Sequence, residues 1–126
     1  MNKNVSAEKP TQLSFKNTAT VHQPCAYLLV NHQNGAIYTG VTSCLIEQVW
    51  KHKHHLIEGF SKKYDIHTLV WYEPYDTLEA AYKKAKSLKD GPFEIKQATV
   101  ERTNPKWRDL YDELCAQQLA PEQKTA

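Results

Sequence analysis

The chain has 126 residues, 40% of them apolar, which is enough for one compact domain and too little for a second. Its net charge is +2, but four of the sixteen Lys and Arg and two of the fourteen Asp and Glu lie outside residues 25–115, which leaves twelve of each sign within. This balance excludes the uniformly basic surface of a protein that binds nucleic acid tightly and indiscriminately.

The composition of both ends of the chain predicts flexible tails. Residues 1–24 are polar, without helical or strand periodicity and without the apolar core of a signal peptide, and residues 116–126 are again polar. A single domain over residues 25–115 is expected between them. No apolar run is long enough to cross a bilayer, and three widely spaced cysteines do not resemble a disulfide framework. We therefore expect a cytoplasmic protein.

Residues 26–30 and 36–41 are two β-rich runs that flank Asn34-Gly35, a dipeptide that adopts the positive φ angles of a tight reversal. This pattern predicts a β-hairpin. Each run carries one tyrosine, Tyr27 and Tyr38, and we expect these two side chains to be cross-strand neighbours on one face that share a pocket.

A helix is predicted next, capped by Thr42 or Ser43 and ending near Gly59. Its apolar residues fall on one side: Leu45, Val49 and Leu56, with Trp50 widening the stripe. Residues 61–64 are predicted to form a basic loop. Residues 67–73, HTLVWYE, predict a third strand that Pro74 ends, and their nearly continuous apolar character indicates either burial on both faces or a central position.

Asp76 and Glu79 have the spacing of a capping box and predict the start of a second helix, which Gly91-Pro92 ends. The apolar stripe of this helix is Leu78, Ala81, Tyr82, Ala85 and Leu88. Residues 93–101 favour a short helix. Asn104-Pro105 has the form of an N-cap followed by proline and predicts a last helix with these residues facing inward: Trp107, Leu110, Tyr111 and Leu114.

Basic residues gather in two places. The first cluster, Lys51, Lys53, Lys62 and Lys63, is accompanied by His52, His54 and His55, and the second is Lys83, Lys84, Lys86 and Lys89. Solvated helix faces explain either cluster alone better than a binding surface does. The four lysines of the first cluster are nevertheless the candidates for contacts with a nucleic-acid backbone.

The hairpin, the KHKHH helix, the EGFSKKY segment, the LVWYE strand and the NPKWRDL ending, taken together from Cys25 to Leu114, resemble the GIY-YIG nuclease family. The first family signature corresponds to residues 25–27 and the second to residues 38–40. The chain is most similar to the short bacterial members, which resemble the amino-terminal nuclease domain of the excision-repair incision subunit. This resemblance implies an α+β fold in which helices flank a small three-stranded antiparallel sheet.

The family hydrolyses nucleic-acid phosphodiesters: a tyrosine helps to deprotonate water, an arginine stabilises the phosphate charge, and a glutamate holds a divalent metal. The resemblance implies the following equivalent positions: Tyr27 and Tyr38 for the tyrosines, Gln48 for the arginine, His52 for the histidine that follows it, Ala85 for the glutamate, and Asn104 for an asparagine near the phosphate. The arginine and the metal ligand are thus replaced. A cap of the last helix explains Asn104 equally well.

Three hypotheses follow. The first is a GIY-YIG-like domain with impaired catalysis and no cofactor that binds DNA, RNA or a protein partner weakly. The second is an active endonuclease that cleaves DNA with Mg²⁺ or Mn²⁺, and the third is a domain with no nucleic-acid role. A transition-metal site at His52 and His55 is disfavoured because no further Cys/His pair has the spacing to complete it.

Overall fold

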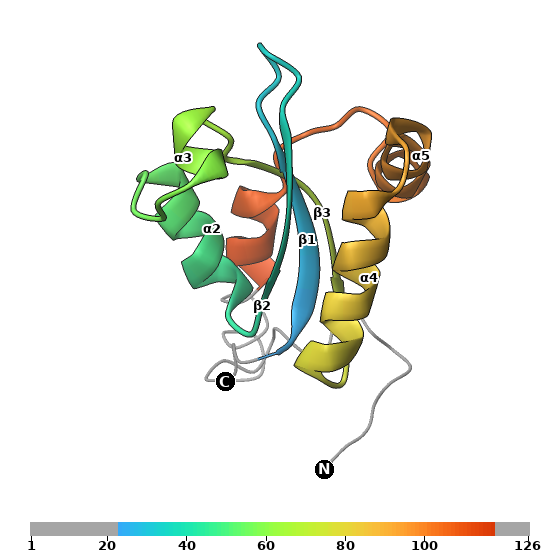
Figure 1. Ribbon diagram of the computed structural model, residues 1–126. Coiled ribbons are helices and arrows are strands. Elements are labelled where there is room, and N and C mark those ends of the chain that lie inside the picture. Colours follow the sequence, from blue (N-terminus) through green and yellow to red (C-terminus); the bar gives the residue numbers. More distant parts are fainter. Residues whose placement is uncertain (1–22, 118–126) are drawn as a thin grey trace.

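The computed structural model describes residues 23–117, which fold into a three-stranded antiparallel sheet with helices on both faces (Figure 1). This confirms the predicted α+β class. In chain order the elements are β1 (Cys25–Val30), β2 (Ile37–Thr42), α2 (Leu45–Lys53), α3 (Phe60–Lys63), β3 (Thr68–Pro74), α4 (Leu78–Asp90) and α5 (Phe93–Thr103), followed by helical residues 111–117.

The strand order is β2-β1-β3, so β1 is central and pairs antiparallel with both neighbours. Side chains of β1 therefore alternate between two cores. Cys25, Tyr27 and Leu29 belong to the first core, which α2 and residues 111–117 cover, whereas Ala26 and Leu28 belong to the second, which α4 and α5 cover (Figure 1). All six residues of β1 are buried.

The predicted hairpin is confirmed, although its turn differs from the expected one. Asn31 N–H donates to the carbonyl of Ala36 across a loop of residues 32–35, and among the described loop residues Gly35 alone has a positive φ, of 74°. Asn34 instead accepts a hydrogen bond from Ala36 N–H through its side chain. The turn therefore depends on side-chain hydrogen bonds where two positive φ angles were expected.

Helix α2 is shorter than predicted. It ends at Lys53, because the chain turns out of the helix through His55, whose φ is 57°. Leu56 consequently leaves the apolar stripe and is 58% exposed. The N-cap residue is Cys44, without a side-chain cap, and Thr42 Oγ1 accepts from its N–H. The predicted basic loop is in fact helix α3.

Strand β3 lies at the edge of the sheet, yet its residues point into both cores, so burial on both faces is confirmed and a central position is wrong. Its open side is covered by residues 104–110, where Leu110 N–H donates to Leu69 O. Helix α4 is capped by Thr77, one residue after the predicted Asp76, and Thr77 Oγ1 accepts from Ala80 N–H.

The stripe of α4 is only partly buried. Ala81, Ala85 and Leu88 are buried as predicted, whereas Leu78 and Tyr82 are 49% and 58% exposed. Gly91 ends α4, and α5 follows it, as predicted. The expected inward residues after Asn104 also reach the cores, because Leu114 is buried in the first core and Trp107 packs against the second.

The last helix does not begin at Pro105. Asn104 is the C-cap of α5, and residues 104–110 form no helix before residue 111. The amide of Asn104 is buried and bonds to Val70 O, Arg108 O and Arg108 N–H, which holds this segment against β3. The predicted N-cap is wrong because the asparagine stabilises an irregular segment and not a helix start.

Most of the predicted tails, residues 1–22 and 118–126, lies outside the described residues. Gln23 and Pro24, however, are joined to the domain, because Gln23 Nε2 donates to Tyr75 O and Tyr75 N–H donates to Pro24 O. Within residues 23–117, every helix is too short or too polar to cross a membrane.

Candidate functional site

Two tyrosines and a histidine meet on the face of the sheet that α2 covers. The centroid of the Tyr27 ring lies 6.2 Å from that of Tyr38 and 5.9 Å from that of His52. The ring centroids of Tyr38 and His52 are 5.0 Å apart. Tyr38 pairs with Leu29 in the register, two residues along β1 from Tyr27, so the tyrosines are diagonal neighbours on one face. The predicted placement of both tyrosines on one face is therefore confirmed, although they are diagonal neighbours and not directly paired.

Gly40 explains how the Tyr27 ring fits there. Tyr27 and Gly40 are directly paired across β1 and β2, and a Cβ at position 40 would overlap the Cζ, OH and Cε2 atoms of the tyrosine. The phenol thus lies over β2 because position 40 has no side chain. The glycine at the position that resembles the second family signature therefore has a packing role.

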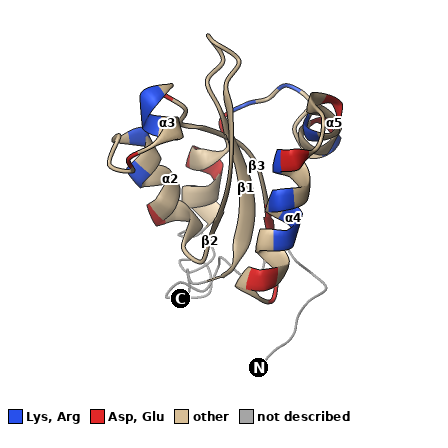
Figure 2. Ribbon diagram, viewed as in Figure 1, with Lys and Arg blue, Asp and Glu red and all other residues tan. Residues whose placement is uncertain are grey.

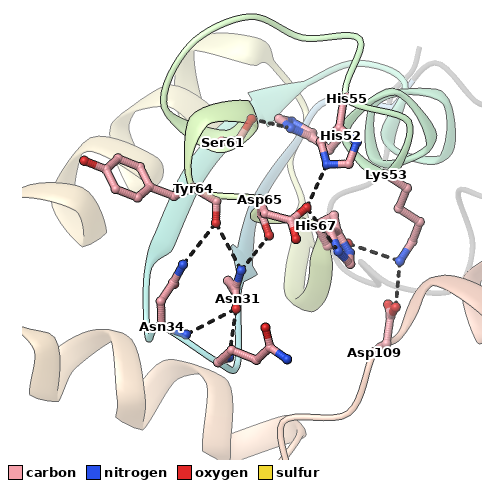
Figure 3. A network of polar contacts seen from close by, with 11 residues as sticks. Asn31, Asn34, His52, Lys53, His55, Ser61, Tyr64, Asp65, His67 and Asp109 are labelled. Carbon is pink, nitrogen blue, oxygen red and sulfur yellow. Dashed lines mark hydrogen bonds and ion pairs between the residues drawn. The ribbon is translucent and has the colours of Figure 1, made fainter.

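The phenol of Tyr27 belongs to a buried hydrogen-bond chain. Its OH lies 3.0 Å from His52 Nε2. His52 Nδ1 lies 2.9 Å from Ser61 Oγ (Figure 3), so one ring nitrogen donates while the other accepts. The chain joins β1, α2 and α3. Ser61 was missed from the sequence, because a lone serine in a basic segment carries no signal of its partner.

Burial sets the protonation of this cluster. Tyr27 is 1% exposed and its pKa is raised far above its usual range, first by burial and then by the nearby Tyr38, against a lowering contribution from a hydrogen bond to Gln48. Burial also lowers the pKa of His52 to about 4. Both groups are therefore neutral at pH 7, and Tyr27 is a poor acceptor for a proton from water.

The structure brings some family-equivalent positions together and separates others. Gln48 contacts Tyr27, as the resemblance implies for the arginine position. Ala85, at the glutamate position, packs in the second core with Ala26 and Leu28, on the opposite face of the sheet from Tyr27. The position equivalent to the family glutamate therefore lies away from the tyrosines, because α4 covers the other face of the sheet.

Asn104 also lies outside the tyrosine cluster. All the hydrogen bonds of its side chain go to Val70 and Arg108, which fixes the segment after α5. Its amide nitrogen donates to two carbonyls and its oxygen accepts from one N–H, so both ends of the amide are engaged in this structural role. The placement favours the structural interpretation of Asn104 over a contact with phosphate.

Three of the four candidate lysines are in ion pairs. Lys51 pairs with Glu47 at 3.1 Å and Lys62 with Glu58 at 2.9 Å, and both pairs are exposed. Lys53 Nζ lies 2.7 Å from Asp109 and donates to His67 O, so it joins α2 to the residue before β3 and to the segment after α5 (Figure 3). Among the described residues Lys63 has no ion pair, and its Nζ lies 5.4 Å from the Tyr64 ring centroid.

The two basic clusters do not form one surface. Lysines of α2 and α3 lie on one side of the sheet and those of α4 on the other (Figure 2). Aromatic side chains accompany the first cluster: Trp50, Phe60 and Tyr64 are 44%, 51% and 39% exposed. The ring of Phe60 lies 4.8 Å from that of Tyr64, and Trp50 stacks on His54 at 4.2 Å. We call Trp50, Phe60, Tyr64, Lys62 and Lys63 the α2–α3 surface.

The histidines of this region do not form the metal pair considered from the sequence. His52 is buried and both its nitrogens are engaged, whereas His55 is exposed and its Nε2 lies 2.7 Å from Asp65 Oδ1 (Figure 3). A hydrogen bond from His55 lowers the pKa of Asp65, with His67 contributing. Within residues 23–117, no group of three His, Cys, Asp or Glu side chains has the arrangement of a metal site.

Comparison with known proteins gives no relative: no family model, no curated protein and no solved structure matches the chain.

Proposed function

We propose that this protein is a nucleic-acid-binding domain of GIY-YIG-like ancestry that does not hydrolyse phosphodiesters. The main support for a loss of activity is the environment of Tyr27. This residue is 1% exposed, its OH is hydrogen-bonded to a neutral His52, and its pKa is raised. Water has no access to such a phenol. Gln48 supplies no positive charge, and residue 85 lies on the far face of the sheet.

The α2–α3 surface supports binding of single strands. Its aromatic rings offer the stacking platforms that unpaired bases use, and Lys63 has its charge available beside Tyr64. The ion pairs of Lys51 and Lys62 are exposed and of low energy, so a phosphate replaces the carboxylate at small cost. The balanced charge of the domain is consistent with weak, salt-sensitive binding.

Fluorescence anisotropy with labelled single-stranded DNA and RNA tests the proposal. We expect salt-dependent binding that the double variant Lys62→Ala/Lys63→Ala weakens by roughly tenfold at low salt, as two lost phosphate contacts predict. The matched control, Lys83→Ala/Lys86→Ala on α4, should bind as the unaltered protein does. Absence of binding, or equal loss in both variants, would leave the domain without a nucleic-acid role on this surface.

Incubation of the purified protein with plasmid DNA and Mg²⁺ or Mn²⁺ tests the alternative. We expect no nicking above that of a preparation in which Tyr38 is changed to Phe. Metal-dependent nicking that Tyr38→Phe abolishes would show an active endonuclease and contradict the proposed loss of catalysis, whatever the binding assay gives.

A further inference from the structure

A concave site lies between the hairpin loop and α5, on the face of the sheet opposite the tyrosine cluster. It has a volume of about 300 Å³, and two of its apolar residues, Val30 and Ile37, belong to the second core. It is therefore separate from the tyrosine cluster. A volume at the lower end of ligand sites suits one small chemical group.

Trp107 is held rigidly at one end of this site. Its indole Nε1 donates to Glu101 Oε2 at 2.8 Å, its main-chain N–H donates to Asn104 O, and its carbonyl oxygen lies 3.1 Å from His32 Nε2. Its φ is 54°, which is uncommon for a residue with a large side chain. Contacts from α5 and from the hairpin thus fix a strained backbone and present the indole to the site.

Helix α5 supplies the wall. Phe93, Gln97 and Glu101 recur every fourth residue and line the site as one row, which extends about 12 Å at the rise of an α-helix. Phe93 is 52% exposed, an unusual state for a large apolar side chain. The site is therefore a slot with an aromatic ring near each end.

The one charged side chain that the slot holds at neutral pH is an acceptor, Glu101, whereas the N–H groups of Asn31 and His32 point to main-chain oxygens of Tyr64, Asp65 and Trp107. Glu101 Oε2 receives the indole N–H and, at 3.4 Å, the amide of Gln97, and within the described residues Glu101 forms no ion pair with a cation. The second carboxylate oxygen and the amide oxygen of Gln97 remain available. A slot with one negative charge, free acceptors and an aromatic face favours a planar cation that donates hydrogen bonds in its plane, and it disfavours phosphate.

We propose that this slot binds a guanidinium group, presented either by an arginine side chain of a partner peptide or by a free guanidino compound. The guanidinium stacks on the Trp107 indole and donates to the free oxygens of Glu101 and Gln97, while the aliphatic stem runs along the slot towards Phe93. An ammonium group lacks the planar face, and a neutral nucleobase lacks the charge that Glu101 complements.

The test titrates N-acetylarginine amide into uniformly ¹⁵N-labelled full chain and follows the indole N–H signals of the three tryptophans. We expect a saturable shift of the Trp107 signal with half-saturation on the order of 1 mM, usual for a ligand of this size. The signal of Trp50, on α2, should stay in place as an internal control. Because N-acetylarginine amide already resembles an arginine within a peptide, methylguanidine is compared with a Gly-Arg-Gly peptide. Tighter binding of the peptide would identify a partner side chain as the source, and tighter binding of methylguanidine would identify a free compound.

Glu101→Gln keeps an acceptor for the indole N–H and removes the charge, and we expect it to weaken binding by about fivefold or more, since a charged acceptor bonds more strongly. The control, Glu94→Gln on the same helix, should leave binding unchanged. The proposal is overturned if the Trp107 signal does not saturate, if Glu101→Gln binds equally well, or if N-acetyllysine amide or guanosine binds and the arginine compound does not.

Discussion

His52 joins three elements through one imidazole ring. It lies on α2, reaches Tyr27 on β1 through Nε2 and Ser61 on α3 through Nδ1, and is 3% exposed. A neutral imidazole satisfies both partners because it offers one donor and one acceptor. A protonated ring would have two donors and a charge buried away from water, so the arrangement depends on the neutral form.

The folded protein should therefore lose stability in acid through His52. Its folded pKa of about 4 lies below the ordinary 6.5, so the unfolded chain binds the proton more readily. The stabilisation is complete above about pH 6.5 and is lost as the pH falls towards 4, up to roughly 3 kcal/mol for this difference in pKa. Urea unfolding of the unaltered protein and of His52→Gln between pH 7.5 and 4 measures this contribution to the free energy of unfolding.

The contribution of His52 is the difference between the two pH profiles, because Asp65 and Asp90, whose pKa values are lowered, also titrate in acid. His54→Gln, an exposed substitution two residues away, should keep the profile of the unaltered protein. Parallel profiles for His52→Gln and the unaltered protein would contradict a neutral, buried His52.

At the scale of elements, the packing of α4 explains residue 85 without a functional role. Its buried residues Ala81, Ala85 and Leu88 follow helical spacing and face the sheet. Position 85 packs in the second core, where a carboxylate would meet apolar side chains. The alanine is therefore explained by packing.

We expect Ala85→Glu to destabilise the fold by roughly 3 kcal/mol or more, the usual cost of a buried charge without a partner. Ser87→Glu, exposed on the same helix, should change the free energy of unfolding by less than about 0.5 kcal/mol. Urea unfolding of both variants gives the comparison. If Ala85→Glu and Ser87→Glu were equally stable, the side chain at position 85 would reach solvent, and position 85 would again be a candidate metal ligand.

The elements that depend on local pattern were predictable from the sequence. The hairpin, β3, α4 and α5 follow from β-branched runs, helical spacing and Gly91-Pro92, all within a few residues. The end of α2, by contrast, depends on the backbone at His55, and the role of Asn104 depends on Val70, which is 34 residues away. Long-range partners of this kind leave no mark on a single sequence.

The same limit applies to the candidate site. The tyrosine pair was predictable because the register of a hairpin fixes which residues share a face. The side of the sheet that α4 covers could not be predicted. An apolar stripe shows which face of a helix is buried, but it does not show which side of the sheet that face packs against. The slot beside Trp107 was missed because its parts come from the hairpin, α5 and an irregular segment.

At the scale of the whole molecule, the central strand makes the two cores one cooperative unit. Alternate residues of β1 enter each core, so neither core can open without exposing the backbone that the other one packs on. Truncation of a buried side chain in either core should therefore destabilise the entire domain. Leu45 in the first core and Leu88 in the second are both fully buried and serve as probes.

We expect Leu45→Ala and Leu88→Ala each to cost about 2–5 kcal/mol, and their free-energy changes to add within about 0.5 kcal/mol because they lie on opposite faces. In each variant the unfolding curves from circular dichroism and from tryptophan fluorescence should coincide, with an unchanged dependence on urea. Two of the three tryptophans, Trp71 and Trp107, pack in or against the second core, so fluorescence reports mainly on that core. Circular dichroism reports on the helices and strands of both. Separate transitions in Leu45→Ala, with the fluorescence change delayed, would instead show that the second core persists when the first has opened.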